Sequence, residues 1–245
     1  MMMNKTFLNS LHIIMSLMLI GIVTSCDDGR IYEKDTAYKE GKTVQIRGVI
    51  HGLETWEDNS YYVAAAGFDN NSEYAVISKI INTTDEDGQV NITLSGIDEN
   101  VNTVELCVLN RLRQRVATFA VHEMTETGTS TMDIGELNVG RYHTIQSTLF
   151  DQSCIACHGG SGFAAAGLHL TEGNSYAAIV NVPSKKVEGK NIVTPGDKDN
   201  SVLHLLLNTD LSSTWRQNHS DMLNKERTSN LLRFIDDWIA NGAKE

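Results

Sequence analysis

The feature that most limits the fold of this chain is an alternation of apolar and polar residues between about residues 42 and 137. In the first run Val44 and Ile46 alternate with the polar Gln45 and Arg47, and Ile50 precedes His51. Later runs rich in β-branched or aromatic residues occupy residues 61–66, 74–81, 90–97, 103–109 and 115–122. Turn signals such as Asp87-Gly88 separate these runs, which is typical of short β-strands. Residues 42–140 therefore predict an all-β sandwich, which we expect to be immunoglobulin-like.

The pattern changes near residue 141, where short helical stretches separated by Gly- and Asn-containing loops begin. The clearest helix is expected over residues 225–240, and Gly242 is placed to end it. Its apolar stripe is formed by Leu231, Ile235, Trp238 and Ile239, whereas Arg233, Asp236 and Asp237 are expected to face away. We therefore predict a second domain, small and all-α, over residues 141–245.

The N-terminal residues do not fit either domain. Lys5 precedes an apolar stretch from Phe7 to Val23 that has the length of the hydrophobic part of a secretory signal. The following Val23-Thr24-Ser25-Cys26 resembles a bacterial lipobox, in which the Cys receives diacylglycerol and becomes the mature N-terminus. The resemblance implies a lipoprotein signal peptide over residues 1–25, a lipid anchor at Cys26 and a linker over residues 26–41. We therefore expect an exported protein, anchored to a bacterial membrane on its periplasmic or cell-surface side. An ordinary transmembrane anchor is the alternative.

Charge and cysteine content exclude two classes of protein. The net charge is −11 and no basic run is longer than Lys185-Lys186, so nucleic acid is not an expected partner. Of the four cysteines, Cys26 is assigned to lipid and Cys107 lies alone in an apolar alternation. The other two are separated by two residues, so no disulfide framework is expected.

One motif carries chemistry, namely Cys154-Ile155-Ala156-Cys157-His158. Two thiols about one helical turn apart can add across the two vinyl groups of haem, and the adjacent His can supply an imidazole nitrogen to the iron. The motif predicts one covalently attached haem c, bound by Cys154, Cys157 and His158. Two alternatives remain. A zinc site would want a second Cys pair or a His pair, and a thioredoxin-like dithiol normally lies in a βαβ unit.

Residues from about 144 to 243 resemble the small bacterial class I cytochrome c domains. In that family a C-x-x-C-H-G signature, here residues 154–159, precedes a Gly-Leu-x-Leu stretch, here residues 167–170. A Pro-Gly-Asp-x-x-x-Ser-x-Leu segment is matched by residues 195–203, and a closing Ile-x-x-Trp-Ile-x-x-Gly-Ala helix by residues 235–243. The resemblance implies that the predicted all-α domain is a cytochrome c domain. It does not extend to the β region.

The resemblance also implies a second axial ligand for the iron. The family usually supplies a Met, followed by Pro, shortly before the final helix. Met222 stands at nearly the matching distance from Trp238, but Leu223 follows it instead of Pro. We predict Met222 as the distal ligand, which would raise the reduction potential relative to two imidazoles. His219 and His204 are the alternatives.

A single haem without an acid–base residue beside it suits electron transfer. We therefore expect a membrane-anchored c-type cytochrome that exchanges electrons with redox partner proteins of the cell envelope, and not a catalyst. A surface binding module is the alternative, in which the β-sandwich recognises a protein or a glycan and the haem is accessory or sensory. A peroxidase-like enzyme is a third possibility, which would require an open position on the iron.

Overall fold

The computed structural model describes residues 41–56, 60–70, 72–124, 128–160, 162–211, 217–223 and 225–245. Residues Glu40–Glu245 form one compact unit. The predicted signal peptide, the lipid anchor at Cys26 and all but the last residue of the predicted linker lie outside the described residues.

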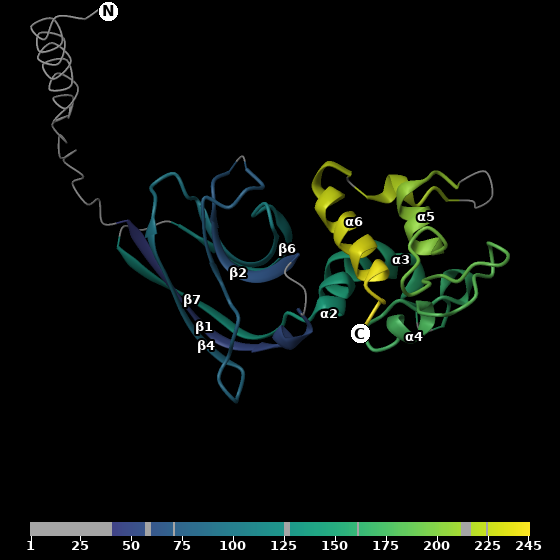
Figure 1. The fold of residues 1–245 in the computed structure, drawn as a ribbon, viewed down its shortest axis with the longest axis horizontal. Helices are drawn as coiled ribbons and strands as arrows, with labels where there is room; N and C mark the ends of the chain where they lie inside the picture. Colours follow the sequence, from purple (N-terminus) through teal and green to yellow (C-terminus); the bar gives the residue numbers. More distant parts are fainter. Residues whose placement is uncertain are drawn as a thin grey trace, which may run out of the picture. The chain divides into compact units, whose positions relative to one another are not determined.

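Seven strands in the described part of the chain form two sheets (Figure 1). The strands are β1 (Lys42–His51), β2 (Tyr61–Phe68), β3 (Ile77–Ile80), β4 (Gln89–Ile97), β5 (Thr103–Asn110), β6 (Arg115–Glu123) and β7 (Thr129–Asn138). One sheet has the order β4-β1-β7 and the other has the order β3-β2-β5-β6. Strand β1 is antiparallel to β4 and parallel to β7, so the first and last strands are direct neighbours.

The two sheets share one apolar core. In β4 the buried Val90, Ile92 and Leu94 alternate with exposed polar residues, as expected for a strand with one covered face. These side chains belong to the same buried cluster as Val44 of β1 and Leu106 of β5. The alternation in the sequence therefore corresponds to an inner face that each sheet presents to the other.

The rest of the described chain consists mainly of short helices joined by irregular segments, with the longer α6 near its end. Their bounds are η1 (Leu53–Thr55), α2 (Arg141–Ile145), η2 (Gln146–Cys154, a π-helix), α3 (Ile155–His158), η3 (Ala165–Gly167), α4 (Ser175–Ile179), α5 (Val202–Asn208), η4 (Ser220–Met222) and α6 (Lys225–Ala240). Among the described residues, no helix is long and apolar enough to cross a membrane.

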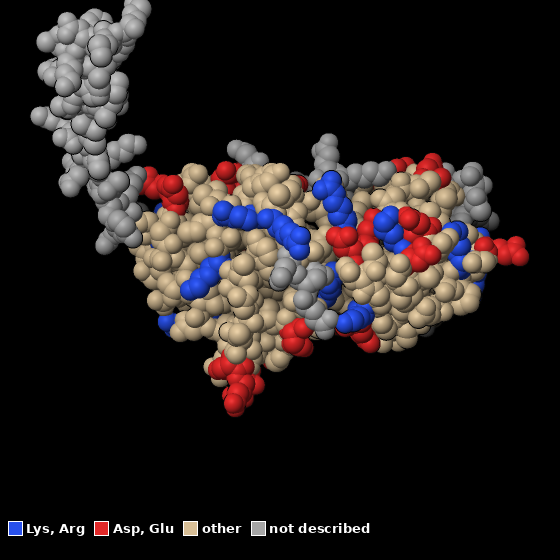
Figure 2. Space-filling view, viewed as in Figure 1, with Lys and Arg blue, Asp and Glu red and all other residues tan. Residues whose placement is uncertain are grey.

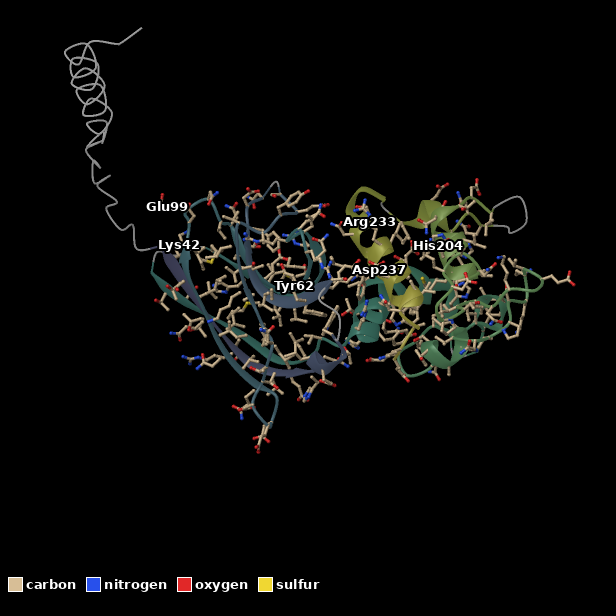
Figure 3. All side chains as sticks on the ribbon, in the orientation of Figure 1. Lys42, Tyr62, Glu99, His204, Arg233 and Asp237 are labelled. Carbon is tan, nitrogen blue, oxygen red and sulfur yellow. The ribbon has the colours of Figure 1, made fainter. Side chains whose placement is uncertain are left out.

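Helix α6 packs against both the strands and the short helices. The ring of Phe234 lies 5.6 Å from that of Trp56 and 5.0 Å from that of Tyr61, measured between ring centroids. The hydroxyl of Tyr61 in β2 donates a hydrogen bond of 2.5 Å to Oδ2 of Asp237, which is labelled on α6 in Figure 3. The indole of Trp238 is fully buried among the short helices, where it contacts the ring of Tyr142.

The predicted fold class is wrong. The structure is mostly β-sheet, with seven strands in two sheets and mainly short helices, and the described residues contain no separate small all-α cytochrome c domain. The physical reason lies in the core beneath α6. Tyr61, Val108 and Ala117 of the strands belong to the same buried cluster as the apolar side chains of the helices. The helices therefore bury their apolar faces partly on the sheet, and a self-contained helical core does not form.

The strand order also differs from the immunoglobulin-like arrangement that we expected. In the constant-type immunoglobulin fold the first, second, fifth and fourth strands share one sheet, and the third, sixth and seventh share the other. Here β1 lies between β4 and β7, while β2 pairs with β3 and β5. The same alternation of apolar residues is compatible with both orders, because alternation fixes which face is buried and not which strand is the neighbour.

A turn at Pro195-Gly196 holds the start of α5 against the end of α6. The N–H of Asp197 donates to the carbonyl of Thr194 at 3.0 Å, and Gly196 has φ 81°, so Pro and Gly occupy the turn positions that favour them. The N–H of Gly196 donates to the carbonyl of Ile239 at 2.8 Å. The turn therefore ties the segment that precedes α5 to the end of α6.

Candidate functional site

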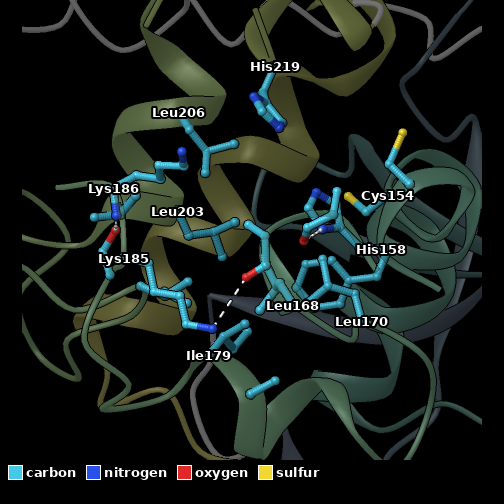
Figure 4. Close-up of a pocket in the computed structure, with 18 of the residues that line it drawn as sticks. Cys154, His158, Leu168, Leu170, Ile179, Lys185, Lys186, Leu203, Leu206 and His219 are labelled. Atoms are coloured by element: carbon cyan, nitrogen blue, oxygen red, sulfur yellow. Dashed lines mark hydrogen bonds between the residues drawn. The ribbon is translucent and has the colours of Figure 1, made fainter. Parts of the chain in front are cut away.

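An apolar cavity of about 760 Å³ lies among the short helices (Figure 4). Its walls come from η2, α3, the segment around η3, α4 and α5, and the apolar lining includes Phe150, Leu168, Leu170, Ile179, Leu203 and Leu206. Cofactor and small-molecule sites are usually concave, mostly apolar cavities of about 300–1,000 Å³ with a few polar groups that orient the ligand. The cavity has this character.

All three predicted haem-binding residues line this cavity. Cys154 precedes α3 as its N-cap, and Cys157 and His158 are the last two residues of the helix. Cys154 is partly buried, whereas Cys157 is exposed. Burial raises the pKa of the Cys154 thiol to about 12, with a further contribution from Cys157, so this sulfur carries its proton at neutral pH.

Two hydrogen bonds fix the orientation of His158. Its Nδ1 donates to the carbonyl oxygen of Ala165 at 3.0 Å, and its own carbonyl accepts from the N–H of Leu170 at 2.8 Å. A carbonyl oxygen can only accept, so Nδ1 carries the proton and Nε2 keeps the lone pair in the neutral ring. This arrangement is typical of a histidine whose second nitrogen binds a metal. Ala166 has a left-handed φ of 56°, a conformation that costs a non-glycine residue energy and that is often found at functional sites.

His219 lies in the same cavity. The centroids of the His158 and His219 rings are 6.4 Å apart and their planes differ by 29°. Burial lowers the pKa of His219; a hydrogen bond with the backbone of Gln217 partly opposes this effect, and the charge of His158 adds to it. Figure 4 shows the His219 ring above the part of the cavity where His158 lies.

The two other predicted distal ligands have different surroundings. Nδ1 of His204 lies 2.6 Å from Oδ1 of Asp236, and Nε2 of His204 lies 3.9 Å from Oδ1 of Asp199. His204 is not among the residues that line the cavity. Met222 is the last residue of η4, and its side chain lies outside the described residues. The structure thus brings His219, and not His204, to the same cavity as His158.

The chain matches no protein-family model, no curated protein and no solved structure. In the described part of the chain, no group of three or more His, Cys, Asp or Glu side chains could hold a bare metal ion.

A series of buried hydrogen bonds runs from Tyr142 to Leu170, which lines the cavity, and it was not predicted from the sequence. The hydroxyl of Ser175 donates to Oε1 of Gln146 at 2.5 Å, so the hydroxyl of Tyr142 donates to Ser175 at 2.7 Å. Nε2 of Gln146 donates to the carbonyl of Leu170 at 3.0 Å. The last residue of this series, Leu170, donates its own N–H to the carbonyl of His158. These polar residues are scattered along the chain without regular spacing, so no sequence pattern could predict the hydrogen bonds between them.

Two lysines line the cavity opposite the cysteines. Lys185 and Lys186 were noticeable in the sequence only as its longest basic run. Nζ of Lys185 donates to the carbonyl of Ala166 at 3.4 Å, as the dashed line in Figure 4 marks. Both side chains are exposed, so they place positive charge at the solvent edge of an otherwise apolar site.

Proposed function

We propose that this chain is a membrane-anchored c-type cytochrome that carries one covalent haem c and exchanges electrons with redox partner proteins of the cell envelope. The observation that carries the proposal is the convergence of Cys154, Cys157 and His158 on one apolar cavity, with Nδ1 of His158 committed to the Ala165 carbonyl. This commitment leaves Nε2 as the nitrogen for the iron.

The cavity fits the chemical character of haem in three respects. Its apolar walls suit a flat, largely apolar macrocycle, and the two thiols can reach two vinyl groups because they are about one helical turn apart. Lys185 and Lys186 can pair with the two propionate carboxylates. The imidazole of His158, on the same helix as the thiols, would supply a nitrogen to the iron.

When bound, haem supplies one-electron redox chemistry at its iron. The residues of the chain attach and shield it. Each cysteine S–H would add across one vinyl group, with the sulfur bonding to one carbon and the thiol proton passing to the other, so that no group leaves. The apolar side chains of α4 and α5 limit access of water, which is one of the means by which a protein sets a reduction potential.

Export and anchoring are part of the proposal and rest on the sequence alone. Bacterial haem attachment to this type of motif takes place outside the cytoplasm, which agrees with the signal-like residues 1–25. Two or three acyl chains at Cys26 would hold the protein at a bilayer, since stable anchoring needs more than one chain.

The proposal is tested by expressing the full chain together with a cytochrome c maturation system. We expect a red protein with one haem per chain, a pyridine haemochrome spectrum typical of two thioether bonds, and haem that remains attached after denaturation. Cys154→Ser and Cys157→Ser should each shift this spectrum, because one vinyl group then stays unsaturated. Cys107→Ala is the matched control, since this buried thiol lies outside the cavity and its loss should leave the spectrum unchanged. A colourless, zinc-containing product would disprove the proposal.

A further inference from the structure

We infer that His219 supplies the second axial nitrogen, so that the iron is held between two imidazoles and not between His158 and the thioether of Met222. The inference rests on the proposed function and names the ligand opposite His158. It differs from the distal ligand that the sequence led us to predict.

The separation of the two rings carries the inference. The ring centroids of His158 and His219 are 6.4 Å apart. An imidazole nitrogen lies about 2.0–2.1 Å from a bound metal such as zinc, and the ring centre lies about 1.1 Å beyond the nitrogen, so two imidazoles on opposite sides of one ion have centres roughly 6 Å apart. The observed distance matches this value. Rings that packed directly on each other would be much closer.

The surroundings of His219 support the same role. The side chain projects into the cavity from the segment before η4, whereas His158 projects from α3, so the two rings come from different walls of one site. Leu206 and Leu223, which also line the cavity, are apolar and offer no nitrogen or sulfur to a metal.

The other histidines of the described residues are placed elsewhere. His204 is held by Asp236, and Nδ1 of His143 lies 3.2 Å from Oε1 of Glu172. His51 pairs with Glu136, His122 lies beside the hydroxyl of Ser130 and His169 is exposed. None of these five histidines lines the cavity. Within the described residues, His158 and His219 are therefore the pair of imidazoles that one ligand in this cavity can contact together.

Bis-imidazole ligation has a consequence for the reaction. A thioether ligand raises the reduction potential of haem relative to a second imidazole. Ligation by His219 therefore makes the protein a lower-potential carrier than a His/Met cytochrome, and its partners would be donors and acceptors of correspondingly low potential.

Spectroscopy of the haem-loaded full chain tests the inference. The ferric wild-type protein should be low-spin, with the paramagnetic resonance signature of two imidazoles and without the sulfur-to-iron charge-transfer band of a His/Met haem. His219→Met should create that band and raise the reduction potential. His219→Gly should turn the iron high-spin, and free imidazole should restore the low-spin spectrum, which also shows that this variant is folded.

Two control variants make the outcome decisive. Met222→Leu and His169→Ala should keep the wild-type spectrum. A charge-transfer band in the wild type that disappears in Met222→Leu, in a protein that still carries covalent haem, would overturn the inference and leave the proposed function intact. Absence of covalent haem in the pyridine haemochrome assay would overturn both.

Discussion

At the scale of single residues, a few buried polar side chains near the cavity help to fix the position of His158. The buried hydrogen bonds from Tyr142 through Ser175 and Gln146 end on the carbonyl of Leu170, and the N–H of Leu170 binds the carbonyl of His158. Removal of one member leaves the next with an incomplete set of partners in an apolar interior, where polar groups without partners are costly. The network therefore links the stability of the fold to the position of His158.

Tyr142→Phe tests this network. Loss of the hydroxyl should lower the free energy of unfolding by about 1 kcal/mol at neutral pH, since one buried hydrogen bond is lost. Burial raises the pKa of Tyr142 above its ordinary value, while in the unfolded chain it ionises near about 10. Above that pH the unfolded state releases the proton first, so wild-type stability falls as pH rises.

The Tyr142→Phe variant has no hydroxyl to ionise. Its free energy of unfolding should therefore fall less than that of the wild type as the pH becomes alkaline. Urea titrations followed by circular dichroism, at about pH 8 and again above about pH 10, measure the difference between the two proteins. The difference in free energy of unfolding between the wild type and the variant should be smaller at the higher pH. If this difference were the same at both pH values, Tyr142 would have the same pKa in the folded and the unfolded chain.

At the scale of elements, α6 shows what could be predicted from the sequence. Its apolar stripe and its end are as predicted. Gly242 has φ 97° and donates to the carbonyl of Ile239 at 3.1 Å, and Ala243 donates to that of Trp238 at 2.9 Å, which is the Schellman arrangement. Arg233 and Asp237 are exposed, also as predicted, and Asp236 is half-buried beside His204. The hydrogen bond that Asp237 accepts from the Tyr61 hydroxyl could not be predicted, because periodicity identifies an apolar stripe and not the neighbours of the polar face.

Phe234→Ala tests the contact between α6 and the strands. The side chain is fully buried against the rings of Trp56 and Tyr61, so truncation should lower the free energy of unfolding by about 3–5 kcal/mol. Phe163→Ala is the matched control, because Phe163 is 78% exposed and its loss should change stability by less than about 0.5 kcal/mol. Chemical denaturation measures both. Similar losses in the two variants would mean that α6 does not depend on the sheet.

The candidate site was predictable to a similar extent. The spacing of Cys154, Cys157 and His158 is local, so it could be found in the sequence, and all three lie in one cavity. The contribution of His219 depends on how the chain returns from α5 to α6. The positions of Lys185 and Lys186 depend on the segment after α4. Contacts between distant segments leave no periodic trace, so the sequence could only name candidates for them.

At the scale of the whole molecule, the net charge should influence encounters with the redox partners that we propose. The net charge is −11, and on the face in Figure 2 Lys and Arg are interspersed with Asp and Glu. Such a molecule attracts cations over distances comparable to the Debye length, so long-range steering favours basic partners and weakens with salt.

Electron exchange between the haem-loaded protein and small complexes measures this steering. A cationic oxidant should react at least about tenfold faster than an anionic oxidant of equal driving force at low ionic strength. The difference should shrink as salt rises from about 0.01 M to 0.1 M, since the Debye length falls from about 30 Å to 10 Å. Stopped-flow absorbance provides the rates. Rates that do not depend on salt for both complexes would show that net charge has no part in the encounter.

The parallel pairing of β1 with β7 has a consequence for how the protein is made. While the ribosome is still producing the later strands, β1 can pair only with β4, and its other edge presents free backbone N–H and C=O groups. An incomplete chain that ends before Thr129 keeps this edge open, and a second copy can then occupy it. The edge of β1 is therefore covered only after the chain has been made through residue 138, and incomplete chains can associate through it until then.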